Sequence, residues 1–176
     1  MKVLFNAGEI AQKVKELGDE ITAAYEGCNL YIIGILKGGF IFMSDLVRAI
    51  RMPVRIGFVR LSSYGNSDRP QGNVRILDDL EDAIQGRHVL IVDDIMDTGQ
   101  SLLAFKKHLE SKGPISVKIC TMINKTQRRT VDMEPDYYGF RVPEGFIVGY
   151  GLDYAEDYRA LPEICVIEPN NGREPA

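Results

Sequence analysis

Two periods of hydrophobic residues alternate along the chain. Ile10, Val14, Leu17 and Ile21 recur at helical spacing, which predicts an amphipathic helix. Short continuous apolar runs, such as residues 30–36, are instead typical of strands buried on both faces. The predicted helices are residues 7–25, 40–50 and 99–112. The predicted strands are residues 30–36, 54–61, 73–78, 88–93, 116–123, 137–140, 146–149 and 164–167.

The order of these segments predicts an α/β fold. Strands that alternate with helices form a mainly parallel sheet joined by right-handed crossovers. Asn6, followed three residues later by Glu9, is typical of a capping box at the start of the first helix. The sequence contains no linker, repeat or low-complexity tract, so residues 1–176 are expected to form a single domain. The polar tail 168–176 is expected to be flexible.

Composition narrows the range of partners. Lys+Arg number 21 and Asp+Glu 25, and a net charge of −4 provides no overall attraction for nucleic acid or anionic membranes. No apolar stretch approaches the ~20 residues of a membrane helix, and the N-terminal segment turns polar too early for a signal peptide. Cys28, Cys120 and Cys165 are widely spaced, as expected of reduced thiols in a cytoplasmic protein. His88 and His108 have neither the spacing nor the neighbours of metal ligands.

Residues 88–101, HVLIVDDIMDTGQS, carry the most chemistry. The apolar run of this segment ends in two carboxylates, Asp93 and Asp94, and a third follows at Asp97. The small and hydroxyl-bearing residues 98–101 then open a helix, whose unpaired N–H groups favour a bound phosphate. Carboxylates beside a phosphate repel it unless they serve a metal, sugar hydroxyls or a proton transfer. The combination therefore indicates a phosphorylated sugar as the ligand.

Three candidate positions come at the ends of predicted strands. These are Lys37, Asp93 and the pair Asn124–Lys125. In parallel α/β sheets, ligands bind beyond the carboxyl ends of the strands. We therefore expect all three positions to open onto one crevice.

The 88–101 segment resembles the phosphoribosyl diphosphate (PRPP) motif of type I phosphoribosyltransferases. From the first strand to Ile167, the chain is similar to the hypoxanthine-guanine phosphoribosyltransferase family. This resemblance implies a twisted, mainly parallel sheet flanked by helices, with a small hood and a mobile lid loop. It also implies that Asp93 and Asp94 handle the ribose hydroxyls and their Mg²⁺, and that Asp97 is the general base on purine N7. The residues implied to hold the 5′-phosphate are Asp97, Thr98, Gly99, Gln100 and Ser101.

Two loops extend the resemblance. The residues that match the diphosphate loop are Lys37, Gly38 and Gly39, and those that match the lid are Ser63 and Tyr64. For the first loop, the resemblance implies a cis peptide bond between Leu36 and Lys37. Closure of a lid would shield a developing sugar cation from water.

Lys125 matches a lysine that bonds the purine O6 and selects 6-oxopurines over adenine, and Arg129 matches an arginine linked to the PRPP side.

A further match is the segment FIVGYGLDYAEDYR at residues 146–159. The resemblance implies that the Phe146 ring lies over the purine and that the Ile147 backbone reads the purine edge. It implies that Asp153 holds a second Mg²⁺ through water and that Arg159 contacts the diphosphate leaving group. Without the resemblance, a phenylalanine here is more often part of a core.

The resemblance implies a cytoplasmic purine-salvage transferase that acts as a homodimer or homotetramer. The enzyme would transfer the 5-phosphoribosyl group of PRPP to N9 of hypoxanthine or guanine, giving IMP or GMP and diphosphate. Its partners would be PRPP and a 6-oxopurine, its cofactor Mg²⁺, and it would bind neither nucleic acid nor membrane.

Three alternatives stay open. Two carboxylates after a strand also occur in phospho-receiver domains, but there they follow the first strand, whereas 92 residues precede Asp93. A related regulator that binds RNA would need a basic surface. An enzyme that prefers xanthine would differ near purine C2, where Ile147, Leu152 and Asp153 are the nearest candidates.

Overall fold

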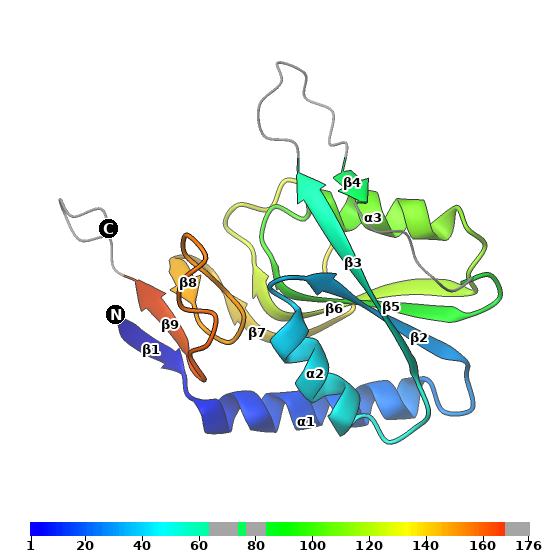
Figure 1. Ribbon diagram of the computed structural model, residues 1–176, viewed down its shortest axis with the longest axis horizontal. Coiled ribbons are helices and arrows are strands. Elements are labelled where there is room, and N and C mark those ends of the chain that lie inside the picture. Colours follow the sequence, from blue (N-terminus) through cyan, green and yellow to red (C-terminus); the bar gives the residue numbers. More distant parts are fainter. Residues whose placement is uncertain (64–73, 77–83, 168–176) are drawn as a thin grey trace, which may run out of the picture.

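The computed structural model describes residues 1–63, 74–76 and 84–167 (Figure 1). Its helices are α1 (Ala7–Ala24), α2 (Phe40–Ala49) and α3 (Gln100–Glu110). Its strands are β1 (Lys2–Phe5), β2 (Leu30–Leu36), β3 (Arg55–Ser63), β4 (Val74–Ile76), β5 (His88–Met96), β6 (Ser116–Lys125), β7 (Tyr137–Val142), β8 (Phe146–Val148) and β9 (Ile164–Ile167).

A six-stranded sheet forms the centre of the molecule, in the order β4-β3-β2-β5-β6-β7. Its neighbouring strands run parallel, except that β3 and β4 are antiparallel. A second sheet of antiparallel strands, β1-β9-β8, lies at one end of the molecule, and we call it the hood (Figure 1). The mainly parallel α/β sheet and the hood agree with the fold expected from the sequence.

The helices cover both faces of the central sheet, with α1 and α2 on one face and α3 on the other (Figure 1). Strand β2 shows why its sequence is apolar throughout. Leu30 and Ile32 pack in the core cluster that contains the buried residues of α1 and α2, whereas Tyr31 and Ile33 pack in the cluster that contains those of α3. Because alternate side chains enter two separate cores, no face of the strand is left polar.

The first helix confirms its sequence prediction. Asn6 Oδ1 accepts hydrogen bonds from the N–H groups of Gly8 (2.9 Å) and Glu9 (3.0 Å), and Glu9 Oε2 accepts one from the Asn6 N–H at 2.8 Å. This reciprocal capping box satisfies donors that a helix start leaves unpaired. The residues at helical spacing, including Ile10 and Val14, are buried.

The predicted end of the central strand at residue 93 was wrong. Strand β5 continues to Met96 because β6 runs beside it, so that Asp93 lies opposite Thr121 and Ile95 opposite Ile123. The two carboxylates are thus part of the strand, near its carboxyl end. The turn predicted to hold a phosphate, residues 97–101, which we call the phosphate turn, begins after them. Strand β1 was not predicted, because its pairing partners Cys165 and Val166 are distant in the sequence.

Some predictions lie outside the described residues. Tyr64 and the tail 168–176 are among them, as is the side chain of Ser63, whose backbone ends β3. No described helix has the length and apolar character that a membrane crossing requires.

The three thiols are expected to react at different rates. Cys120 and Cys165 are 0% and 2% exposed, and burial raises the pKa of both thiols. Cys28 is only partly buried. Since the thiolate is the reacting form, Ellman's reagent at about pH 8 should modify Cys28 first and the other two thiols only after unfolding. Equal rates for all three in the native protein would contradict the buried placement, and a guanidinium-unfolded sample supplies the total.

Candidate active site

Two half-buried carboxylates lie near the end of the central strand β5. The Asp94 N–H donates to Asp93 Oδ1 at 3.0 Å. Burial, followed by the charge of Asp94, raises the pKa of the Asp93 carboxyl well above its ordinary value. Burial also raises the pKa of Asp94, although the nearby Arg159 guanidinium acts in the opposite direction. Adjacent carboxylates in this environment favour a cation or hydroxyl donors beside them.

The loop after β2 packs directly on this pair. The peptide bond between Leu36 and Lys37 is cis, as the resemblance implied. A Cβ on Gly38 would fall well inside contact distance of Asp94 Oδ2, so any other residue there would require the Asp94 carboxylate to move. Gly39 is the N-cap of α2, and the helix therefore begins directly at this loop.

The turn between β5 and α3 presents the start of a helix. Gly99 is the N-cap, with φ +80°, and no side chain caps the helix there. The Gln100 N–H makes only a long 3.5 Å bond to Thr98 Oγ1, and Ser101 is the next residue of α3. N–H groups in this position and the helix dipole favour an anion. The turn therefore has the chemistry that the sequence predicted for a phosphate site.

Arg129 forms hydrogen bonds that link this turn to the end of β6. Its side chain is 10% exposed. Its donors bond Asp97 O (2.9 Å), Met96 O (3.1 Å), Lys125 O (3.0 Å), Asn124 Oδ1 (2.7 Å) and Met133 O (2.6 Å). Most of these acceptors are backbone carbonyls at the carboxyl ends of two neighbouring strands. Arg129 therefore stabilises the backbone that carries the phosphate turn.

Asp97 lies at the start of that turn. Its Oδ2 is 3.3 Å from Arg128 Nη1, and its side chain is 27% exposed. Its Oδ1 is buried and has no hydrogen-bond partner among the residues that the structure describes. An oxygen without a donor in such a place is a ready proton acceptor. Sequence reasoning assigned no role to Arg128, since one arginine in a polar loop gives no distinctive signal.

The segment 146–159 lies against the glycine loop. A Cβ on Gly151 would fall well inside contact distance of Gly38 O, so the two backbones touch. Arg159 Nη1 donates to Gly151 O at 2.8 Å, and Arg159 Nη2 pairs with Asp153 Oδ1 at 2.8 Å. Two residues predicted to serve the diphosphate and a metal are therefore paired with each other.

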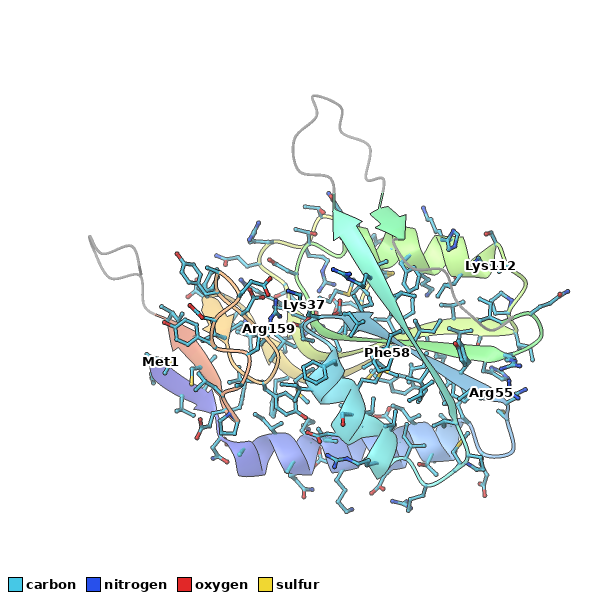
Figure 2. All side chains as sticks on the ribbon, viewed as in Figure 1. Met1, Lys37, Arg55, Phe58, Lys112 and Arg159 are labelled. Carbon is cyan, nitrogen blue, oxygen red and sulfur yellow. The ribbon has the colours of Figure 1, made fainter. Side chains whose placement is uncertain are left out.

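Glu156 connects the two cations of this region. Its Oε2 is 2.7 Å from Lys37 Nζ, and its Oε1 is 3.6 Å from Arg159 Nη2. Figure 2 shows Lys37 and Arg159 next to each other, between the central sheet and the hood. The hydrogen bond from Lys37 lowers the pKa of the Glu156 carboxyl, which favours its ionised form. Glu156 stands in the matched 146–159 segment, but sequence reasoning gave it no role.

The purine-site candidates come from two places. Lys125 is the last residue of β6 and is only 8% exposed. Phe146 begins β8 and is half exposed, and its ring meets that of Tyr154 edge-on, with centroids 5.1 Å apart. Ile147 beside it is buried.

The donor set near β5 suits Mg²⁺. Carboxylate oxygens such as those of Asp93 and Asp94 are the ligands that this ion prefers. Within the described part of the chain, no cluster of three or more acidic, His or Cys side chains could hold a metal by itself. Mg²⁺ in proteins is commonly bound through one or two carboxylates together with substrate phosphates. Asp153 Oδ1 pairs with Arg159 and its Oδ2 accepts from the Glu156 N–H at 2.9 Å, so a metal-bound water would share these oxygens with both donors.

Comparison with known proteins identifies the class to which this fold and site belong. The model of the phosphoribosyl transferase domain matches residues 2–155. The chain is 44% identical to a hypoxanthine-guanine phosphoribosyltransferase of Bacillus subtilis over 96% of this chain and 93% of that protein. A crystal structure of a hypoxanthine phosphoribosyltransferase from Staphylococcus aureus has a TM-score of 0.94 and 40% identity, covering 99% of this chain and 95% of that chain.

The chain therefore belongs to the phosphoribosyl transferase family, and within it to the hypoxanthine-guanine phosphoribosyltransferases. It has the type I fold of that family, and the phospho-receiver alternative is excluded. It also matches a bifunctional TilS/HprT protein of Listeria innocua at 45% identity, but spans only 26% of that protein's length.

Proposed function

We propose that the chain transfers the 5-phosphoribosyl group of PRPP to N9 of hypoxanthine or guanine, giving IMP or GMP and diphosphate. In this reaction the bond from ribose C1′ to N9 forms as the bond from C1′ to diphosphate breaks. The proton on purine N7 goes to Asp97. Mg²⁺, bound with Asp93 and Asp94, would neutralise charge on the diphosphate.

One observation carries this proposal. The carboxylate pair of Asp93 and Asp94 lies under Gly38, and the uncapped start of α3 follows in the same strand-to-helix connection. Two cations complete the set: the Arg159 guanidinium acts to lower the pKa of Asp94, and Lys37, which precedes Gly38, shares the Glu156 carboxylate with Arg159. This order of groups fits PRPP, which carries a 5′-phosphate, two ribose hydroxyls and a metal-bound diphosphate.

The remaining candidates fit the purine. Lys125 is held close to the phosphate turn because Arg129 bonds the carbonyls of both Lys125 and Asp97. A lysine there can donate to a purine O6, whereas adenine presents an amino group at that position. We assign Phe146 as the ring that lies over the purine and the Ile147 backbone as the group that reads its edge.

An assay with four purines tests the proposal. The protein is incubated with PRPP, Mg²⁺ and either hypoxanthine, guanine, xanthine or adenine, and the nucleotide products are measured. Formation of IMP and GMP, with no product from adenine, is the expected result. Preferential use of xanthine would correct the substrate. Absence of turnover with every base, together with salt-dependent RNA binding, would favour the regulator alternative.

We also propose a homodimer or homotetramer, and a cytoplasmic location in keeping with the free cysteines. Phe40, Ile56 and Phe58 are 47%, 50% and 43% exposed, and Phe58 is labelled on β3 in Figure 2. Ile56 and Phe58 are two residues apart on β3 and so share one face of that strand, and exposed apolar groups on one face are typical of an interface. Phe58→Asp should therefore reduce the sedimentation coefficient to that of a monomer. Val3→Asp, at an exposed site in the hood, should leave it unchanged, and an intact Phe58→Asp oligomer would contradict this interface.

A further inference from the structure

The carboxylate of Glu156 pairs with both cations of the candidate diphosphate site, Lys37 and Arg159. Its oxygens lie 2.7 Å from Lys37 Nζ and 3.6 Å from Arg159 Nη2. The two cations come from distant parts of the chain. Lys37 is 119 positions from Glu156, whereas Arg159 lies in the same segment as Glu156. A single side chain of this protein therefore makes the bridging contacts that an oxyanion of the substrate would make.

The backbone holds Glu156 in this place. Its N–H donates to Asp153 Oδ2 at 2.9 Å, and the backbones of Tyr154 and Asp157 exchange hydrogen bonds of 3.2 and 3.0 Å. Ala155 and Glu156 have φ values of +50° and +72°, which side-chain-bearing residues rarely adopt. The tight turn projects the carboxylate toward the glycine loop rather than away from it, as the Lys37 contact shows.

The site has a further hydrogen-bond donor that an anion could use. Arg159 Nε is buried and has no hydrogen-bond partner among the described residues. The Lys37 and Glu156 side chains are 58% and 64% exposed, so the ion pair between them is weak and easily exchanged. A diphosphate can therefore displace the Glu156 carboxylate from both cations.

We propose that Glu156 is an internal substitute for the diphosphate of PRPP. In the free protein its carboxylate holds Lys37 and Arg159 in place, and PRPP must displace it in order to bind. Glu156 then competes with diphosphate for the same cations and favours release of this product. It is thus a positioning residue that sets the affinity for the donor, an inference that rests on the function proposed above.

Removal of the Glu156 charge should tighten binding of the anion. Mg²⁺ with inorganic diphosphate is titrated into wild-type protein and Glu156→Gln by calorimetry, and PRPP is titrated in the same way. The variant is expected to bind both about 3- to 5-fold more tightly, because no exposed ion pair has to be broken. The KM for hypoxanthine and the melting temperature should not change, because the exposed Glu156 side chain pairs with Lys37 and Arg159, and the backbone bond from Glu156 to Asp153 is kept in the variant.

Two variants make the experiment specific. Asp157→Asn removes the same charge from the adjacent exposed residue, whose side chain forms no ion pair within the described part of the chain, and should leave diphosphate affinity unchanged. In a Lys37→Met background, Glu156→Gln should tighten binding by less than about 1.5-fold, because the nearer of the two cations for which Glu156 competes is gone and Arg159 lies 3.6 Å away.

The outcomes are distinct. Tighter binding by Glu156→Gln but not by Asp157→Asn, with loss of the effect in Lys37→Met, supports the inference. Equal or weaker binding by Glu156→Gln overturns it, as does an equal gain from Asp157→Asn. If wild-type protein binds neither diphosphate nor PRPP, the proposed function itself fails, and this inference fails with it.

Discussion

Replacement of Asp97 by asparagine is expected to lower kcat about 10²- to 10⁴-fold, the range typical of a lost general base. Asparagine has nearly the same shape, so the turn that begins at Asp97 should persist and PRPP affinity should remain nearly unchanged. The variant removes only the proposed acceptor for the purine proton. Asp97 Oδ1 is buried and has no hydrogen-bond donor among the described residues, which leaves it available to take that proton. Steady-state kinetics and calorimetry with PRPP measure the two quantities separately.

Asp132→Asn is the matched control for Asp97→Asn. Asp132 is exposed in the loop that follows Arg129, and its replacement should leave kcat within about twofold of wild type. Full activity of Asp97→Asn would remove this residue from the mechanism. A loss of PRPP binding with unchanged kcat would instead make Asp97 a binding residue.

The sequence predicted most elements because their signals are local. Helix α1 begins with a capping box whose two members are three residues apart, and its buried face repeats at helical spacing. Strands β2 and β9 have the predicted bounds, since each is a short apolar run between turns. The phosphate turn was equally local, because its glycine, hydroxyl residues and helix start are contiguous.

The errors come from pairing between distant segments. Apolarity ends at Val92, yet β5 continues through Asp93 and Asp94 because β6 supplies hydrogen-bonding partners there. Strand β1 exists only because β9 lies beside it. No local pattern contains that information.

In the candidate site, too, features encoded locally could be predicted, whereas contacts between distant segments could not. Lys37, Asp93 and Lys125 were expected to open onto one crevice. Lys37 follows β2, Asp93 lies near the carboxyl end of β5 and Lys125 is the last residue of β6, so the three come from neighbouring parallel strands. The contacts between side chains could not be predicted. The Lys37–Glu156 pair and the six acceptors of Arg129 depend on how the hood and the loop after β6 fold back.

Replacement of Arg129 by methionine is expected to lower the free energy of unfolding by about 3–5 kcal/mol, the cost of removing one partner from a buried charged network. The Arg129 guanidinium bonds backbone carbonyls at the ends of both β5 and β6. Methionine fills a similar volume but leaves those carbonyls without donors. The phosphate turn should lose its support as well, so PRPP affinity should fall. Urea unfolding at one protein concentration measures the first effect and calorimetry the second.

Arg128→Met is the matched control for this variant, because the two arginines are adjacent and differ mainly in burial. The Arg128 side chain is 66% exposed and pairs with Asp97 across 3.3 Å, so its loss should change the free energy of unfolding by less than about 1 kcal/mol. Arg129→Lys keeps the charge but offers three donors on one nitrogen, which cannot reach all of the carbonyls, and should be intermediate. Equal stability of Arg129→Met and Arg128→Met would show that the buried network does not hold the turn.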